Sequence, residues 1–303
     1  MTDESIEKSI TAVNDYLAYI KKNYKLPKER IFVVASSGVK MAAEKHGKLD
    51  EVQQKLNKGI KDRDGNIKFI TAEQEAYYVI KGATLPRYRA VSSTIDIGSG
   101  NTKGGFLFGE RLENIKPVSF DFGTETFAEE INSQKLERLI GYDSLAKLLA
   151  TELVGKSVDK GFEEVKGLET RKIVHLVGGA AWSMVTYLYP EKVDEPFVPV
   201  TMADIGRYKK GLLEEYELLV RPNLSFIANE EMRERAQGEI DRATANFNRE
   251  KLIAGAIILE EIARRYNEPL FNKRFVYARQ GYIGWITGYV METVTQEYAK
   301  LDE

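Results

Sequence analysis

Residues 93–108 read Ser-Thr-Ile-Asp-Ile-Gly-Ser-Gly-Asn-Thr-Lys-Gly-Gly-Phe-Leu-Phe, and this stretch is the most informative in the chain. Residues 91–97 are mostly β-branched or small, which predicts a buried strand with Asp96 at its carboxyl end. Residues 98–101 then predict a tight turn, because glycine and asparagine tolerate backbone conformations that other residues avoid. A second strand begins at about Lys103, so the stretch is predicted to be a strand, a turn and a strand.

The turn in this hairpin has the composition of an anion site. A sharp turn of small residues points several N–H groups at one spot, and such a group of donors suits a phosphate. The hydroxyls of Ser99 and Thr102 add donors, and Asp96 can face a divalent cation that bridges phosphates. The alternative interpretation is an ordinary glycine-rich hairpin with a surface aspartate.

Two other places in the chain combine a strand, a turn of small residues and the N-terminus of a helix. The predicted strand 31–35 leads into Ser36, Ser37 and Gly38, and the predicted strand 173–177 leads into Gly178, Gly179 and Ala180. Free N–H groups at a helix N-terminus can hold an anion. The alternatives are an ordinary serine helix cap at the first turn and close strand–helix packing at the second.

The composition limits the class of protein. The 303 residues are 43% hydrophobic, which is enough for one large domain or two packed ones. With 44 basic and 46 acidic residues, the net charge of −2 directs the protein to neither nucleic acid nor an anionic membrane. The chain has no cysteine, and His46 and His175 are far apart, so thiolate and histidine metal sites are not expected. The first residues do not resemble a signal peptide and no run is apolar enough to span a membrane, so we expect a cytoplasmic protein.

A helix with acidic residues in its first turn precedes the hairpin. Thr71 is a suitable helix cap with Gln74 three residues later, and Glu73 and Glu75 lie in the first turn. Acidic side chains are common at this place because they favour the positive end of the helix dipole. The two carboxylates point to different faces of the helix, so they are not expected to share a proton.

Three stretches together resemble the exopolyphosphatase / guanosine pentaphosphate phosphohydrolase (Ppx/GppA) family of the actin, sugar-kinase and Hsp70 superfamily. The family patterns are Ser-Gly-x-Glu-Glu-Ala, then Asp-Ile-Gly-Gly-Gly-Ser-Thr-Glu, then Gly-x-Gly-Gly-Thr. The corresponding stretches here are Thr-Ala-Glu-Gln-Glu-Ala at 71–76, Asp-Ile-Gly-Ser-Gly-Asn-Thr-Lys at 96–103 and Val-Gly-Gly-Ala-Ala at 177–181. Their order and spacing agree with the family.

The resemblance implies an α/β, actin-like (ribonuclease H-like) fold with two lobes and a phosphate cleft between them. It implies hydrolysis of phosphoanhydride bonds in inorganic polyphosphate or guanosine pentaphosphate, with Glu75 activating the water and Asp96 helping to hold Mg²⁺. Homodimers are usual in the family, so a homodimer is the expected assembly. The residues expected to bind phosphate are Ser36, Ser37, Gly38, Gly98, Ser99, Gly100, Asn101, Thr102, Gly178, Gly179 and Ala180.

The sequence also departs from the family pattern. The family's first phosphate loop, Asp-x-Gly-Ser-Asn-Ser, is not found, so the first lobe is expected to be incomplete at its N-terminus. Lys103 replaces a family acid, which should weaken metal binding and strengthen direct contact with an anion. Lys40 stands where the family has an arginine, and Ala180 and Ala181 replace a Gly-Thr pair.

Residue patterns predict further elements along the chain. They predict a strand over 107–115, an amphipathic helix over 142–155 and a proline-rich, charged surface loop over 190–199. A helix is expected over 202–220, and an exposed helix without a clean apolar stripe over 229–246.

Together these observations predict three segments and leave the function open between alternatives. Residues 1–90 are expected to form the partial first lobe with the catalytic glutamate, 91–284 the second lobe with the hairpin, and 285–303 a C-terminal helix that can return to the first lobe. A phosphoanhydride hydrolase is the first interpretation. A homologue that binds phosphate or nucleotide without catalysis, and an actin-like protein that assembles with nucleotide, are the alternatives.

Overall fold

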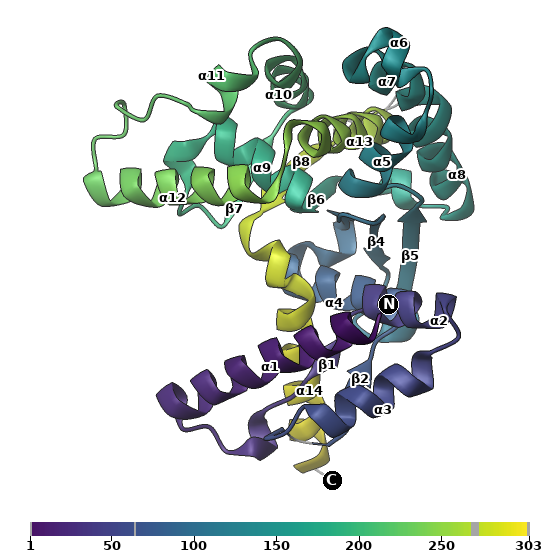
Figure 1. Cartoon of the computed structure of the whole chain (residues 1–303), viewed down its shortest axis with the longest axis vertical. Coiled ribbons are helices and arrows are strands. Elements are labelled where there is room, and N and C mark those ends of the chain that lie inside the picture. Colours follow the sequence, from purple (N-terminus) through teal and green to yellow (C-terminus); the bar gives the residue numbers. More distant parts are fainter. Residues whose placement is uncertain (1, 64, 268–272, 302–303) are drawn as a thin grey trace. The chain divides into compact units, whose positions relative to one another are not determined.

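The computed structural model describes residues 2–63, 65–267 and 273–301, without the side chains of 295–301 (Figure 1). The chain divides into two compact units, Met1–Glu75 (unit 1) and Ala76–Glu303 (unit 2). The division falls inside one helix, α4 (Ala72–Ala83). This division between Glu75 and Ala76 comes earlier in the chain than residue 90, where the sequence predicted a domain boundary. The domain boundary at residue 90 stays a prediction.

Unit 1 consists of helices around one short pair of strands. Its elements are α1 (Asp3–Tyr24), β1 (Val34–Ala35), α2 (Ser37–Lys45), α3 (Leu49–Gly59), β2 (Lys68–Phe69) and the first turn of α4. β1 and β2 pair in parallel, with Ala35 opposite Phe69. Apolar side chains from all three helices form its core, including Leu17 of α1, Ala43 of α2 and Val52 of α3. The strand expected over 31–35 is therefore found, but only its last two residues pair.

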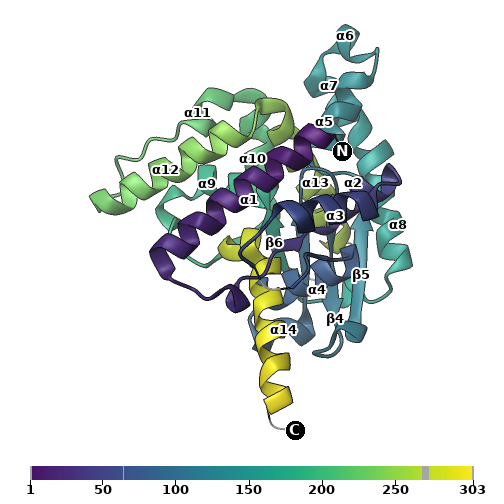
Figure 2. The ribbon, with the colours of Figure 1, turned by 60° about the horizontal axis from the view of Figure 1, so that its bottom comes forward.

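The described residues of unit 2 form a six-stranded sheet in the order β5-β4-β3-β6-β8-β7. The strands are β3 (Ser92–Ile97), β4 (Thr102–Leu107), β5 (Ile115–Phe120), β6 (Ile173–Gly178), β7 (Phe197–Val200) and β8 (Arg274–Ala278). β3, β6 and β8 are parallel neighbours, whereas β4, β5 and β7 are antiparallel to the strands they join. Figure 2 shows β4 and β5 side by side. The sheet is thus mixed, with its parallel strands in the centre.

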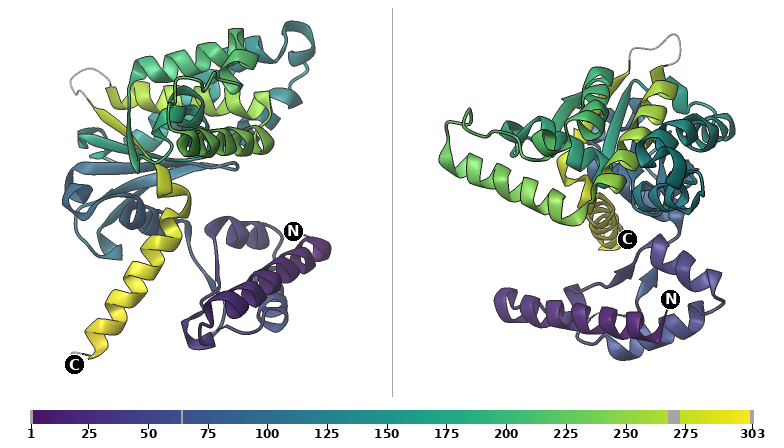
Figure 3. Two further views of the ribbon diagram at one scale, coloured as in Figure 1. Left: turned by 90° about the vertical axis from the view of Figure 1, so that its left-hand side faces the viewer. Right: turned by 45° about the horizontal axis from the view of Figure 1, so that its top comes forward.

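Helices cover both faces of this sheet (Figure 3). The helices of unit 2 that follow α4 are α5 (Thr124–Ser133), α6 (Glu137–Ile140), α7 (Tyr142–Leu149), α8 (Lys156–Glu164), α9 (Gly179–Leu188), α10 (Met202–Glu214), α11 (Tyr216–Val220), α12 (Glu230–Asn246), α13 (Arg249–Asn267) and α14 (Gly284–Leu301). The large core lies between one face and α5, α7, α8, α9 and α13. Val177 and Ala278 point to the opposite face and pack against α4 and α14. Successive residues of a strand face opposite sides, which explains why one strand serves both cores.

Short turns complete the described chain. Three-residue to six-residue 3₁₀ turns lie at Lys28–Arg30, Pro86–Val91, Leu112–Asn114, Leu168–Thr170, Pro190–Lys192 and Arg279–Ile283, and a π-helical turn lies at Ala150–Gly155. No described helix has both the length and the apolar character needed to cross a membrane.

The structure corrects several sequence-based expectations. The strand expected over 107–115 is instead the end of β4, a 3₁₀ turn and the start of β5. The expected loop 190–199 contains most of β7, and Pro199 is accommodated because β7 is an edge strand. The single helix expected over 202–220 is divided at Glu215 into α10 and α11. The helix expected over 142–155 is α-helical only as far as Leu149, and the residues Ala150–Gly155 form the π-helical turn.

Candidate functional site

The hairpin turn between β3 and β4 is closed by its own backbone. The Gly98 N–H donates to the Asn101 carbonyl at 3.1 Å, and Ile97 faces Thr102 across the strand pair. None of residues 98–101 has a positive φ, so the left-handed conformations allowed for in this turn are not used. Among the described residues, the N–H groups of Ser99, Gly100 and Asn101 have no hydrogen-bond acceptor. Three adjacent amides of the turn are therefore available to an anion, and that of Gly98 is not.

The N-terminus of α5 supports this turn from behind. The Thr124 N–H donates to the Gly98 carbonyl at 3.0 Å, and the Glu125 N–H donates to the Ser99 carbonyl at 2.9 Å. Gly123 precedes the helix, and a Cβ at this position would lie 2.4 Å from the Ser99 oxygen. Because these contacts use the carbonyls of the turn, they orient its backbone without occupying the three available amides.

Thr102 has a structural role that the sequence did not indicate. Its side chain is fully buried, and its hydroxyl donates to the Phe122 carbonyl at 2.8 Å. This bond ties the start of β4 to the segment after β5. The Thr102 hydroxyl, expected to be an additional phosphate donor, is therefore used inside the fold, whereas Ser99 is exposed.

The turn after β6 lies beside the hairpin because β3 and β6 are parallel neighbours. Asp96 and Ile97 of β3 face Val177 and Gly178 of β6. Gly178 has φ 86° and ψ 175°, a conformation that is essentially restricted to glycine. A Cβ there would lie 2.4 Å from the Ile97 carbonyl oxygen and 2.5 Å from Asp96 Oδ1. The Asp96 carboxylate therefore lies next to the N-terminus of α9.

Carboxyl ends of parallel strands share one edge of a sheet, and this edge collects part of the predicted site. Asp96, the turn 98–101 and the turn at Gly178 and Gly179 lie together there. Ala180 is within α9 and its methyl group is buried near Gly255 of α13. Ser36, Ser37, Gly38 and Glu75 belong to unit 1.

No group of three or more histidine, cysteine, aspartate or glutamate side chains suitable for a metal ion occurs in the part of the chain that the structure describes. Asp96 alone nevertheless fits Mg²⁺, because this ion is often held by one or two carboxylates, several waters and the phosphates of a substrate. The neighbouring turn carries the N–H groups of Ser99, Gly100 and Asn101, which have no acceptor among the described residues.

In unit 1, the predicted base and the first predicted phosphate turn contact each other. Glu75 is buried, and its Oε2 accepts a hydrogen bond of 2.8 Å from the Ser37 N–H. The helix that carries Glu75 begins with a capping box, in which the Gln74 N–H donates to Thr71 Oγ1 and the Thr71 N–H donates to Gln74 Oε1. The cap predicted at Thr71 is confirmed. The contact between Glu75 and Ser37 was not predicted.

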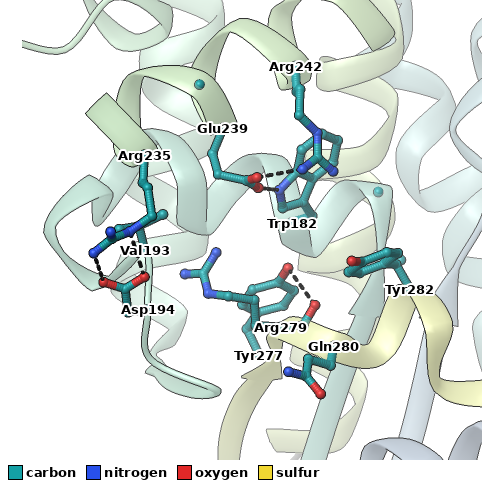
Figure 4. A pocket seen from close by; sticks show the side chains of 13 residues that line it. Trp182, Val193, Asp194, Arg235, Glu239, Arg242, Tyr277, Arg279, Gln280 and Tyr282 are labelled. Atoms are coloured by element: carbon teal, nitrogen blue, oxygen red, sulfur yellow. Dashed lines mark hydrogen bonds and ion pairs between the residues drawn. The ribbon is translucent and has the colours of Figure 1, made fainter. Parts of the chain in front are cut away.

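A cavity of about 550 Å³ lies beside the turn after β6 (Figure 4). On one side, the Trp182 Nε1–H donates to Glu239 at 2.9 Å, and Arg242 pairs with the same carboxylate while lying 5.3 Å from the Trp182 ring. Tyr277, Arg279 and Tyr282 lie on the other side. The remaining lining residues are Gly178, Gly179, Val193, Asp194, Arg235, Gly238 and Gln280.

Charge and planar surfaces characterise this cavity. The Arg235 guanidinium donates two hydrogen bonds to the Asp194 carboxylate, at 3.1 and 2.7 Å, and these bonds raise the pKa of Arg235. Burial raises the pKa of Tyr277, so its hydroxyl stays neutral. The arginines and aromatic rings together suit a planar group that carries negative charge nearby.

Sequence reasoning missed this cavity. Four of its lining residues come from α12, which was expected to be an exposed helix without a clear apolar stripe. The missed signal is the spacing of Arg235, Glu239 and Arg242, which places them on one face of a helix. The sequence alone does not show that Trp182 and Tyr282 face the same space.

The fold defines an α/β protein of the actin-like class, as the sequence predicted. Residues 1–197 match the sequence model of the Ppx/GppA phosphatase family, and the chain belongs to this family. The resemblance found in the three sequence stretches is thereby confirmed.

Solved structures share this fold at low sequence identity. An exopolyphosphatase-like protein is similar with a TM-score of 0.64 and 15% identity, over 97% of this chain and 86% of that one. The Aquifex aeolicus member of the Ppx/GppA family is similar with a TM-score of 0.63 and 18% identity, over 97% and 83%. An exopolyphosphatase from Cytophaga hutchinsonii is similar with a TM-score of 0.54 and 15% identity, over 94% and 83%. None of the curated proteins compared with the chain matches it.

Proposed function

We propose that the protein hydrolyses phosphoanhydride bonds and releases phosphate from inorganic polyphosphate or guanosine pentaphosphate. Membership of a phosphatase family supports this class of reaction. The observation that carries the proposal is the hairpin turn, where the N–H groups of Ser99, Gly100 and Asn101 lack acceptors among the described residues and lie beside Asp96. Such amides bind phosphate oxygens and stabilise the charge that develops on them.

Each part of the chain has a defined role in this proposal. The amides of the hairpin turn, with those at Gly178 and Gly179, hold phosphate groups. Asp96 is the residue that would hold Mg²⁺, and a bound Mg²⁺ neutralises charge on phosphate oxygens. Glu75 acts as general base and takes a proton from the attacking water. The water then attacks phosphorus, and the bond to the leaving phosphate oxygen breaks.

The first experiment is phosphate release from long-chain polyphosphate and from guanosine pentaphosphate with Mg²⁺. The Glu75→Gln variant keeps an oxygen acceptor of similar size but cannot take the proton, so its turnover should fall by at least about 100-fold. Glu73→Gln is the matched control, because Glu73 lies in the same helical turn with an exposed side chain. Equal turnover of the wild type and Glu75→Gln would remove Glu75 from its role.

The cavity beside Gly178 favours a second candidate, a nucleotide-binding protein with or without catalysis. A linear polyphosphate has no planar group, whereas the cavity offers Trp182, Tyr282 and the guanidinium of Arg242. Stacking of a base on such surfaces contributes about 1–3 kcal/mol. This candidate predicts tight binding of a phosphorylated guanosine.

Calorimetric titration of the wild type separates the two candidates. Guanosine pentaphosphate and a short polyphosphate of similar charge are titrated in turn, with and without Mg²⁺. A nucleotide-binding protein binds the guanosine compound at least about tenfold more tightly. Equal affinities would argue against a base in the cavity.

A further inference from the structure

Two helices of unit 1 begin at the same edge of its small sheet. β1 and β2 are parallel, and the Ile70 N–H donates to the Ala35 carbonyl at 3.1 Å where the strands end. The chain enters α2 directly after β1 and enters α4 shortly after β2. Because parallel strands end at a common edge, the N-terminus of α2 and the first turn of α4 are brought together.

Glu75 fills the position that a capping side chain normally takes on α2. The N-cap residue, Ser36, makes no side-chain capping bond to its own helix. The carboxylate of Glu75 instead accepts the Ser37 N–H at 2.8 Å, with both residues almost fully buried at 4% and 3% exposure. A carboxylate at the N-terminus of a helix is stabilised by the free N–H groups and by the helix dipole.

This contact conflicts with the predicted role of the turn. Ser36, Ser37 and Gly38 were expected to bind phosphate through their backbone amides. The Ser37 N–H cannot serve a phosphate oxygen while it donates to Glu75, because an N–H has one hydrogen to share. A phosphate at this place would also lie against the Glu75 carboxylate.

We propose that the turn 36–38 positions the general base and does not bind the substrate. In this role Ser37 is a positioning residue, whose backbone amide fixes the plane of the Glu75 carboxyl group through Oε2. The inference rests on the proposed function of Glu75, and it assigns phosphate binding to the turns of unit 2. A fixed carboxylate matters because a displacement of about 1 Å from the productive geometry can cost about 100-fold in rate.

Proline at residue 37 removes the amide hydrogen with little other change. Ser37 is the first residue of α2, a position where proline is favoured. Ser36 has φ −63° and ψ 163°, an extended conformation that is tolerated before proline. Ser37→Pro should lower kcat by roughly 10- to 100-fold while KM for long-chain polyphosphate changes less than about threefold.

Two further variants separate this effect from a general disturbance. Ser37→Ala loses the hydroxyl but keeps the N–H, so it should retain most of the kcat that Ser37→Pro loses. Met202→Pro places proline at the first residue of α10, after Thr201 in extended conformation, and should leave turnover unchanged. If Ser37→Pro raises KM and leaves kcat unchanged, the turn binds substrate and the proposal is wrong. If it lowers only the melting temperature, the contact is a helix cap alone and the proposal is equally wrong.

Nuclear magnetic resonance tests the contact without a substitution at residue 37. In protein labelled with ¹⁵N-serine, the Ser37 amide resonance should move strongly in Glu75→Gln and stay in place when polyphosphate is added to the wild type. Movement on adding polyphosphate, with no response to Glu75→Gln, would overturn the proposal even if Ser37→Pro does not fold.

The kinetic results also distinguish this inference from the proposed function. If wild type releases no phosphate, or Glu75→Gln releases it equally fast, the proposed function itself fails. If Glu75→Gln is inactive while Ser37→Pro matches the wild type in kcat, only the positioning role fails.

Discussion

The stability of unit 2 should depend on pH through one buried histidine. His175 lies on β6 between Thr94 of β3 and Val276 of β8, and only 3% of it is exposed. Its Nδ1 has no hydrogen-bond partner within the described part of the chain, and its ring meets that of Phe197 edge-on. Burial in these surroundings disfavours the charged ring and lowers the pKa of His175 from 6.5 to about 4, although a hydrogen bond with the Ser93 backbone opposes the change.

The sign and size of the effect follow from these two pKa values. Between about pH 6.5 and pH 4 the unfolded chain binds a proton at His175 and the folded chain does not, so acid favours unfolding. The contribution of neutral, buried His175 to the free energy of unfolding is fully present above pH 6.5 and declines as the pH falls. Below about pH 4 it is lost and no longer changes with pH. The pKa values differ by about 2.5, which corresponds to about 3 kcal/mol in total and about 2 kcal/mol between pH 7 and pH 5.

Urea unfolding of the wild type and His175→Gln at pH 7 and pH 5 measures this contribution. Glutamine cannot titrate but can still donate a hydrogen bond, and groups other than His175 contribute equally to both proteins. The free energy of unfolding should therefore fall by about 2 kcal/mol more in the wild type than in the variant. A difference below about 0.5 kcal/mol would refute the assignment of a neutral, buried His175.

Three glycine substitutions give further predictions. Gly288→Ala should lower the free energy of unfolding by about 1–3 kcal/mol, because its Cβ would lie 2.1 Å from the Tyr78 carbonyl oxygen where α14 packs on α4. Gly206→Ala on α10, with no atom within 4 Å of the new Cβ, should raise it by about 0.5–1 kcal/mol, and urea unfolding compares the two. Gly178→Ala should lower the free energy of unfolding by about 1–3 kcal/mol, because the new Cβ would press on the Ile97 carbonyl. The same substitution should reduce phosphate release, and release at the wild-type rate would contradict this prediction.

Local patterns predicted the local structure well. The capping residues Thr71 and Gln74 and the buried strand before the hairpin are found as predicted, because each depends on neighbouring residues only. The edge strand β7 was missed because its pairing with β8 depends on a distant segment and its Pro199 suggested a loop. The sequence therefore predicted the order of elements better than their pairing.

The candidate site was predictable in part for the same reason. The turn 98–101 and Asp96 follow from one continuous stretch. The use of the Thr102 hydroxyl by Phe122, and of the Ser37 amide by Glu75, depends on residues 20 and 38 positions away. A sequence indicates which groups can donate hydrogen bonds, but the tertiary fold decides which of them are already used.

Both edges of the six-stranded sheet carry a proline. Pro117 lies in β5 and Pro199 in β7, the two outer strands. Proline has no N–H, and in an edge strand it stands where an N–H would otherwise face outward. A strand from another molecule that paired with β5 or β7 would lack one N–H donor at the proline. Lys116 beside Pro117 also adds a charge to the β5 edge. The sheet is thereby protected against edge-to-edge aggregation while its parallel centre stays fully paired.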